Sequence, residues 1–160
     1  MEKAPGALSA EDIFLRLPIP YTSLMTATPM VPVSWGELLD KITILQIKQE
    51  RLRDDAKRIN VTVELTALTA VAGTGMAQAA ALLAALKKVN EALWDIEDRI
   101  RDKERDAAFD AEFIALARAV YVTNDKRADL KRDINRLLGS ALMEEKSYSP
   151  YTQGPAGASQ

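Results

Sequence analysis

The stretch DAEFIALARAVYVTNDKRADLKRDINRLL, residues 110–138, decides the fold. Its apolar residues recur at helical spacing and form one stripe along a long helix: Leu116, Val120, Leu130, Ile134 and Leu137. The stripe has a gap between Val120 and Leu130. Helical spacing places Thr123 or Asn124 and then Arg127 in that gap. Burying an arginine without a partner costs several kcal/mol. We therefore expect a neighbouring helix, a ligand or water to meet Arg127.

An earlier helix begins at a clear start signal. Ser34-Trp35-Gly36-Glu37 fits a capping box, in which the Ser34 hydroxyl accepts from the Glu37 amide and the Glu37 carboxylate accepts from the Ser34 amide. An apolar stripe follows at positions Leu38, Ile42, Leu45, Leu52 and Ile59. This spacing predicts a helix over about residues 35–58.

Two more segments complete the predicted body. Residues 60–71 read as a short helix that is stopped by Gly73-Thr74-Gly75. The alanine-rich run that follows opens a long helix over residues 78–105, with a stripe at Leu82, Leu86, Val89, Leu93, Ile96 and Ile100. Phe109 and Ile114 fit a hydrophobic staple at the start of the last helix.

Together these segments predict an all-α protein, an antiparallel bundle of three long helices and one short helix. We expect the helical-bundle domain to span residues 31–148. Residues 1–30 are expected to form a disordered or loosely packed N-terminal arm, and residues 149–160 a flexible tail. The predicted core consists of Leu45, Leu52, Leu86, Leu93, Ile96, Val120 and Ile134.

Composition removes several classes of chemistry. The chain has 160 residues, a formal net charge of −2, and neither cysteine nor histidine. A zinc site with histidine or cysteine ligands, a Ser-His-Asp triad and a thiol nucleophile are therefore excluded. The lack of a basic surplus argues against nucleic acid as a partner. Because no run of about 18 apolar residues occurs and the first residues lack a signal-peptide pattern, we expect a cytoplasmic protein.

Polar residues beside the apolar stripes of three helices form the candidate ligand site. They are Asp40, Lys41 and Lys48; Asn90, Trp94, Glu97 and Arg101; and Asn124, Arg127 and Lys131. One interpretation is a polar network between helices, in which Arg127 pairs with Glu97 or Asp40. The other is a cationic pocket for a carboxylate or phosphate, built from Lys41, Lys48, Arg127 and Lys131.

The charged residues around Glu97 leave a further alternative. They form a mixed charge run, which is typical of a solvated helix face with pairs such as Glu97 to Arg101. In the alternative, Glu97 and Asp98 bind magnesium, with Glu37 and Asp40 as a second acidic pair, as in all-helical nucleotide pyrophosphohydrolases. We predict no metal or cofactor and keep magnesium as the alternative.

Several stretches together resemble a bacterial family known only as a domain of unknown function. They are VPVSWGELLDKITILQIK from Val31, NEALWDIEDRIR from Asn90, TNDKRADLKRDINRLLGS from Thr123 and EEKSY from Glu144. They extend over most of residues 31–148. The resemblance implies a compact helical domain in bacteria, sometimes encoded beside genes for surface-polysaccharide synthesis, and it supplies no catalytic residue.

Two functions from different classes are consistent with these patterns. The first is a non-catalytic helical binding or accessory module that contacts a partner protein, which the resemblance links to surface-polysaccharide biosynthesis. The alternative is a small enzyme or sensor that acts on an anionic metabolite between the first, third and fourth helices. An exposed apolar patch favours the first function, and a concave site lined by Lys41, Arg127 and Lys131 favours the second. Either function is compatible with a homodimer.

Overall fold

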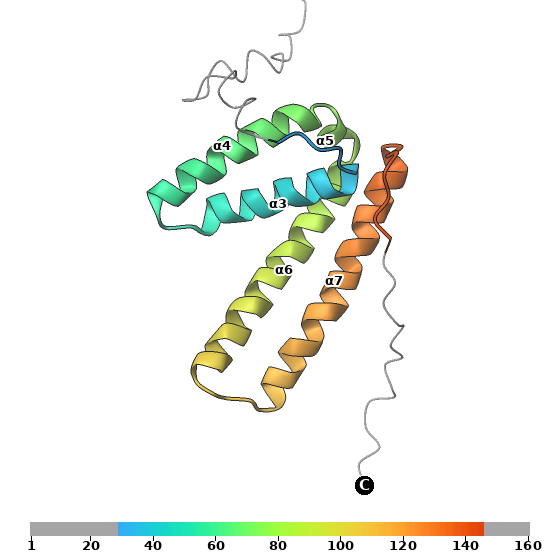
Figure 1. The fold of residues 1–160 in the computed structure, drawn as a ribbon. Helices are drawn as coiled ribbons and strands as arrows, with labels where there is room; N and C mark the ends of the chain where they lie inside the picture. The colour runs from blue at the N-terminus through green and yellow to red at the C-terminus, as the bar shows by residue number, and fades with distance from the viewer. Residues whose placement is uncertain (1–28, 146–160) are drawn as a thin grey trace, which may run out of the picture.

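The structure, a computed structural model, describes residues 29–145. Its elements are α3 (Trp35–Arg51), α4 (Asp55–Ala72), α5 (Gly75–Gln78), α6 (Ala80–Arg105) and α7 (Ala111–Leu137) (Figure 1). Within this range there is no strand, so the predicted all-α class is confirmed. None of the helices in residues 29–145 combines the length and apolarity needed to cross a membrane. The expectations for residues 1–28 and 149–160 lie outside the described residues.

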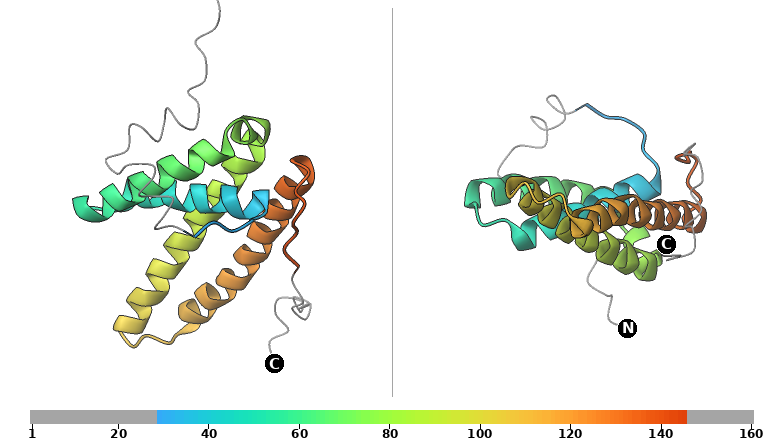
Figure 2. Two further views of the ribbon diagram at one scale, coloured as in Figure 1. Left: turned by 45° about the horizontal axis from the view of Figure 1, so that its top comes forward. Right: turned by 90° about the horizontal axis from the view of Figure 1, so that it is seen from below.

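The helix α3 is the central element of the fold. It contacts α4, α6 and α7, while α6 and α7 pack on each other as a long hairpin. In Figures 1 and 2, α3 and α4 lie side by side across one end of this hairpin. The other end, where residues 106–110 connect α6 to α7, extends beyond α3. The hairpin is therefore covered by α3 over only part of its length.

The first long helix is shorter than predicted. It ends at Arg51 rather than near Arg58, and Leu52 has an extended backbone (φ −70°, ψ 132°). Asp54 then starts α4, because its carboxylate accepts a backbone N–H of the first turn at 3.1 Å. The predicted boundary was wrong because the apolar stripe was followed through to Ile59, which is 61% exposed.

In consequence α4 is longer than the predicted short helix and has 18 residues. It ends at Ala72 and is capped by Gly73, whose φ of 48° favours glycine; the sequence predicted a helix stop at Gly73. The single turn α5 leads into α6, and a Cβ at Gly75 would lie only 2.7 Å from the Trp35 ring. Besides the single turn α5, the described residues thus contain four long helices of 17, 18, 26 and 27 residues, rather than the predicted three long helices and one short one.

The core lies where α3 crosses the hairpin. Its fully buried large apolar side chains are Leu39, Ile42, Leu45, Ile47, Leu86 and Ile134. Four residues of the predicted core are buried, namely Leu45, Leu86, Leu93 and Ile134. The prediction was wrong for Leu52, Ile96 and Val120, which are only partly buried. Leu52 lies in the α3–α4 turn, and the other two lie toward the free end of the hairpin, where fewer helices pack.

Candidate functional site

The start of α3 is held by the end of α7. Ser34 accepts a backbone N–H of the first turn of α3, as the capping box predicts. The Gly36 N–H donates to Asn135 Oδ1 at 2.6 Å, and the Trp35 N–H donates to Ser140 Oγ at 3.3 Å. The N–H groups at a helix start have no partner within the helix. The last turn of α7 and the residues after it supply those partners.

Gly36 sets how closely α3 and α7 approach. A Cβ at this position would lie 2.6 Å from the backbone oxygen of Lys131, so a side chain has no room there. The Glu37 carboxylate, which the capping box assigned to the Ser34 amide, pairs with the Lys131 ammonium instead. One turn further along α3, the same approach brings Asp40 against α7.

Asp40 and Arg127 form a bidentate ion pair between α3 and α7. The Arg127 Nε donates to Asp40 Oδ1 at 2.9 Å, and its Nη2 donates to Asp40 Oδ2. Asp40 is buried, and the Arg127 side chain is 29% exposed. The hydrogen bonds to Asp40 raise the pKa of the Arg127 guanidinium, although burial acts in the opposite direction. The expectation that Arg127 meets a carboxylate is confirmed, and its side chain is shielded from solvent in part.

A third helix joins this pair through Asn90 of α6. The Asn90 Nδ2 donates to Asp40 Oδ1 and to Thr43 Oγ1, both at 2.8 Å. The Thr43 hydroxyl in turn donates to the Asp40 backbone oxygen at 2.8 Å. Among the described residues, every fully buried side-chain nitrogen or oxygen has a hydrogen-bond partner. We call Asp40, Thr43, Asn90 and Arg127 the buried network; it fixes three helices relative to one another.

Lys131 forms a second ionic link one turn along α7. Its ammonium pairs with Glu37 at the start of α3 and with Glu144 after α7, the latter at 2.6 Å. Burial by itself lowers the pKa of Lys131, but the hydrogen bonds to Glu144 and Glu37 outweigh it, so the pKa is raised. Lys131 therefore fastens the segment that follows α7 to the body.

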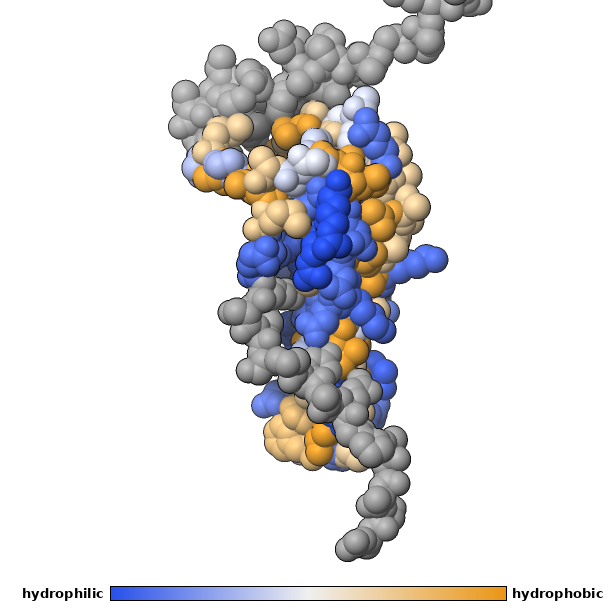
Figure 3. Space-filling model, turned by 90° about the vertical axis from the view of Figure 1, so that its right-hand side faces the viewer, coloured by the Kyte–Doolittle hydropathy of each residue, from blue (hydrophilic) through white to orange (hydrophobic). Residues whose placement is uncertain are grey.

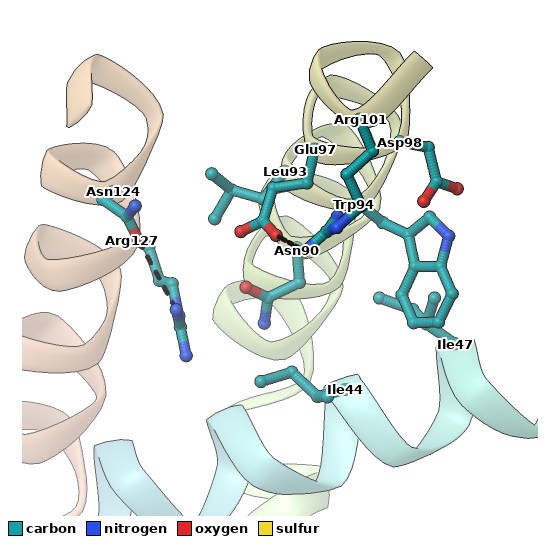
Figure 4. Close-up of a pocket in the computed structure, with 10 residues that line it drawn as sticks. All are labelled: Ile44, Ile47, Asn90, Leu93, Trp94, Glu97, Asp98, Arg101, Asn124 and Arg127. Carbon is teal, nitrogen blue, oxygen red and sulfur yellow. Dashed lines mark hydrogen bonds and ion pairs between the residues drawn. The ribbon is translucent and has the colours of Figure 1, made fainter. Parts of the chain in front are cut away.

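A cleft of about 490 Å³ lies beside the buried network, between α3, α6 and α7 (Figure 4). Its apolar wall comes from Ile44 and Ile47 of α3 and from Leu93 and Trp94 of α6. The Arg51 guanidinium lies 5.7 Å from the centre of the Trp94 ring, within the range of a cation–π contact. A cleft of this size that combines apolar walls with a few polar groups is typical of ligand sites.

The polar groups of the cleft face one another across it. Figure 4 shows Asn124 and Arg127 on the α7 side, opposite Asn90 and Glu97 on α6. The Arg127 Nη1 lies 3.4 Å from Asn124 Oδ1. Arg101 also lines the cleft and pairs with Glu97 at 2.7 Å, as the helical spacing predicted.

The structure brings together most of the predicted site residues. Six line the cleft, namely Asn90, Trp94, Glu97, Arg101, Asn124 and Arg127, and Asp40 lies directly behind them. Lys131 lines a smaller hollow of about 170 Å³ that shares Asn124 and Arg127 with the cleft.

The predicted cationic pocket is not assembled. Lys41 turns toward α4 and pairs with Glu64 at 3.0 Å, and Lys48 is not among the residues that line the cleft. Arg127 and Lys131 are both bound to carboxylates of the protein. The prediction that Lys41 faces the cleft was wrong because Lys41 faces α4. That helix begins earlier in the chain than the predicted residue 60.

The arrangement of carboxylates also bears on the magnesium alternative. Glu37 and Asp40, the proposed second acidic pair, are bound by Lys131 and Arg127 rather than turned toward Glu97. Within residues 29–145, no three acidic side chains gather closely enough to hold a metal ion. Asp40 and Glu37 are therefore held in ion pairs between helices, while Glu97 pairs with Arg101 within α6.

Sequence reasoning missed some residues that complete the site. Thr43 was not singled out, although its position three residues after Asp40 is one that allows a hydroxyl to bond to the preceding turn. Ile44 and Ile47 were not predicted as site residues, yet both line the cleft. Glu144 was noted only within a family stretch, and its contact with Lys131 has no signal in the spacing.

Over residues 30–159 the chain matches a family described as a family of unknown function (DUF6165), and it belongs to that family. No curated protein and no solved structure matches the chain. The resemblance to a family of unknown function is thus confirmed. The bacterial origin and the link to surface-polysaccharide synthesis stay predictions.

Proposed function

We propose that this member of DUF6165 is a non-catalytic binding module that holds a small polar molecule in the cleft between α3, α6 and α7. The observation that carries the proposal is the cleft itself, about 490 Å³ with an apolar wall on one side and amide, guanidinium and carboxylate groups on the others. Ligand sites in proteins combine these two kinds of lining, because apolar contact supplies affinity and a few polar groups supply orientation.

The rigidity of the surrounding structure supports this proposal. The buried network ties the three helices that line the cleft, and Gly36 keeps α3 against α7. A site built on packed helices is held in a fixed geometry, which reduces the ordering that binding requires.

The pairing of the charged groups favours binding over proton transfer. Arg127 is bound to Asp40 and Arg101 to Glu97, and the chain contains no histidine or cysteine. A general acid or base works best with a pKa near the working pH. Groups held in ion pairs are better suited to orienting a ligand.

The proposal is tested by methyl NMR with a chemically mixed library of small fragments. Binding in the cleft is expected to shift the methyl resonances of Ile44, Ile47 and Leu93 in a saturable way. The methyl groups of Ile59 and Leu137, which are exposed elsewhere on α4 and α7, serve as controls. If fragments shift the control methyls as often as the cleft methyls, the cleft is not a ligand site and the proposal is wrong.

A second candidate function, contact with a partner protein through a helix face, is favoured by the free end of the hairpin. Phe109 and Ile114 are 59% and 58% exposed there, and the Phe109 ring packs edge-on against Phe113 with 5.2 Å between centroids. Figure 3 shows apolar side chains gathered at this end of the molecule. The test is analytical ultracentrifugation of the wild type and of Phe109→Ser/Ile114→Ser. Self-association that the double variant abolishes would place a homodimer contact at this end, and equal masses for both proteins would exclude one.

A further inference from the structure

The orientation of the Asn90 amide determines what the cleft offers to a ligand. The Asn90 Nδ2 donates to the Asp40 carboxylate and to the Thr43 hydroxyl. A carboxylate can only accept hydrogen bonds, so the nitrogen of the amide has to face Asp40. The Asn90 oxygen is thereby turned away from the buried network, toward the cleft (Figure 4).

The Asn90 oxygen lacks a hydrogen-bond donor in the part of the chain that the structure describes. Within residues 29–145, no hydrogen bond reaches Asn90 Oδ1, although the residue is only 5% exposed. The residue lines the cleft, so a molecule in the cleft can supply the missing donor. A polar atom in such a position favours a ligand that satisfies it over one that leaves it unpaired.

This acceptor discriminates against anions. The oxygens of a phosphate or carboxylate accept hydrogen bonds and have no hydrogen to donate to Asn90 Oδ1. The guanidinium groups of the cleft give an anion little attraction, because Arg127 is bound to Asp40 and Arg101 to Glu97. Asp98 adds a further negative charge to the lining. A neutral ligand with hydrogen-bond donors fits this charge pattern better.

The opposite wall offers donors. The Arg127 Nη1 makes only a long contact of 3.4 Å with Asn124 Oδ1, and among the described residues the Asn124 amide nitrogen donates no hydrogen bond. Both residues line the cleft, so both can donate to a ligand there. A hydroxyl group both donates and accepts. A hydroxyl, or two adjacent ones, can therefore accept from the α7 side while donating to Asn90 Oδ1 on α6.

We propose that the cleft binds a neutral polyhydroxylated molecule, of which a sugar ring is the chemical class that fits. The hydroxyls lie between Asn90 and the Asn124–Arg127 wall, and the C–H face of the ring lies on the apolar wall formed by Ile44 and Leu93. This inference rests on the proposed function, since it names the ligand class of the same cleft.

The experiment compares neutral sugars with their charged derivatives on the full chain. Three groups of compounds are titrated into the protein: uncharged hexoses and disaccharides, the phosphates of the same hexoses, and the corresponding uronic acids. The methyl resonances of Ile44 and Leu93 report binding. We expect saturable shifts with at least one neutral sugar, and binding at least tenfold weaker for its phosphate and its uronic acid.

Paired variants locate the binding. Asn124→Leu and Glu97→Ala remove polar groups from opposite walls and are each expected to weaken sugar binding at least tenfold. Asn60→Leu and Glu104→Ala make the same changes at exposed positions outside the cleft and are expected to leave affinity unchanged. Circular dichroism checks that each variant is folded. If Asn124→Leu does not fold, Glu97→Ala with its control carries the test.

The outcomes separate this inference from the proposed function. Cleft shifts caused by the phosphates or uronic acids but not by the neutral sugars would overturn the ligand class and leave the binding module intact. Fragments that bind the cleft while no sugar does would overturn it in the same way. If neither fragments nor sugars shift the cleft methyls, both proposals are wrong. Sugar binding that Glu104→Ala weakens as much as Glu97→Ala would place the site outside the cleft and overturn the inference.

Discussion

Arg127 binds Asp40 through two nitrogens across 87 residues of sequence. The pair lies at the point where α3 crosses α7, with Asn90 of α6 bonded to the same carboxylate. One side of Arg127 serves this contact, and another side lines the cleft. The residue that interrupts the apolar stripe of α7 is therefore the residue that connects the core to the candidate site.

Removing the guanidinium is expected to destabilise the protein strongly. Arg127→Leu leaves the Asp40 carboxylate buried without its ionic partner, which should lower the free energy of unfolding by about 3 kcal/mol. Adding Asp40→Asn removes the stranded charge and keeps an oxygen that accepts from Asn90, so the double variant should recover part of that loss. Urea denaturation measures both values.

The matched control for this change is Arg132→Leu, on the same helix. Among the described residues Arg132 pairs with Asp129 alone, one turn away, and its side chain is 39% exposed against 29% for Arg127. Its replacement should therefore change the free energy of unfolding by less than about 1 kcal/mol. Equal effects of Arg127→Leu and Arg132→Leu would show that the Asp40 pair is not the source of the stability.

A methyl group at Gly36 is expected to destabilise the protein. In an open helix position, glycine to alanine stabilises by about 0.5–1 kcal/mol, because glycine loses more backbone freedom on folding. At Gly36 the added Cβ would meet the Lys131 backbone oxygen at 2.6 Å. We expect Gly36→Ala to lower the free energy of unfolding by about 1–3 kcal/mol, measured by urea denaturation. A variant as stable as the wild type would contradict the close approach of α3 and α7.

Truncation of apolar residues in the predicted stripes of α6 and α7 should have unequal effects, depending on whether the residue is buried. Leu93 is buried where α3 covers the hairpin, so Leu93→Ala should cost about 2–4 kcal/mol. Leu137 belongs to the predicted stripe of α7 but is 55% exposed, so Leu137→Ala should cost less than about 1 kcal/mol. Thermal and urea unfolding of both variants test this difference. An unchanged midpoint for Leu93→Ala would mean that its side chain does not pack in the core.

The ion pair illustrates what the sequence can and cannot predict. The interrupted stripe places Arg127 on the face of α7 that packs against other helices, because helical periodicity alone fixes that face. The structure shows its side chain as partly buried there, with 29% exposed. Whether Arg127 pairs with Asp40 or with Glu97 depends on where α3 crosses α7. Helical periodicity within one segment does not predict that crossing point. Glu97 finds a partner locally in Arg101, and the crossing point is set by the contact of Gly36 with Lys131.

The misplaced lysine has a different cause. Periodicity places Lys41 beside the stripe of α3 but does not say which neighbouring helix it faces. That neighbour is α4, which begins at Asp55 with Asp54 as its cap, whereas the sequence predicted a helix that begins at residue 60. Aspartate is favoured at helix N-caps, so Asp54 is a sequence signal for a second helix that begins there. With that boundary, Lys41 would be predicted to face α4, where it pairs with Glu64.

The link from Lys131 to Glu37 and Glu144 is expected to fail at high pH. The pKa of Lys131 is raised above its ordinary value of 10.5, so the folded protein holds this proton more tightly than the unfolded chain does. The stabilisation is therefore fully present below the unfolded pKa and is lost as the pH rises through the folded pKa.

The measurement is the difference in free energy of unfolding between the wild type and Lys131→Met, by urea denaturation at a series of pH values. That difference should be constant from about pH 7 to about pH 9 and should shrink above about pH 10.5. Lys126→Met, a change at an exposed lysine of the same helix, should give a small difference at every pH. If the Lys131→Met difference instead grows above about pH 10.5, the ammonium is not held by the two carboxylates.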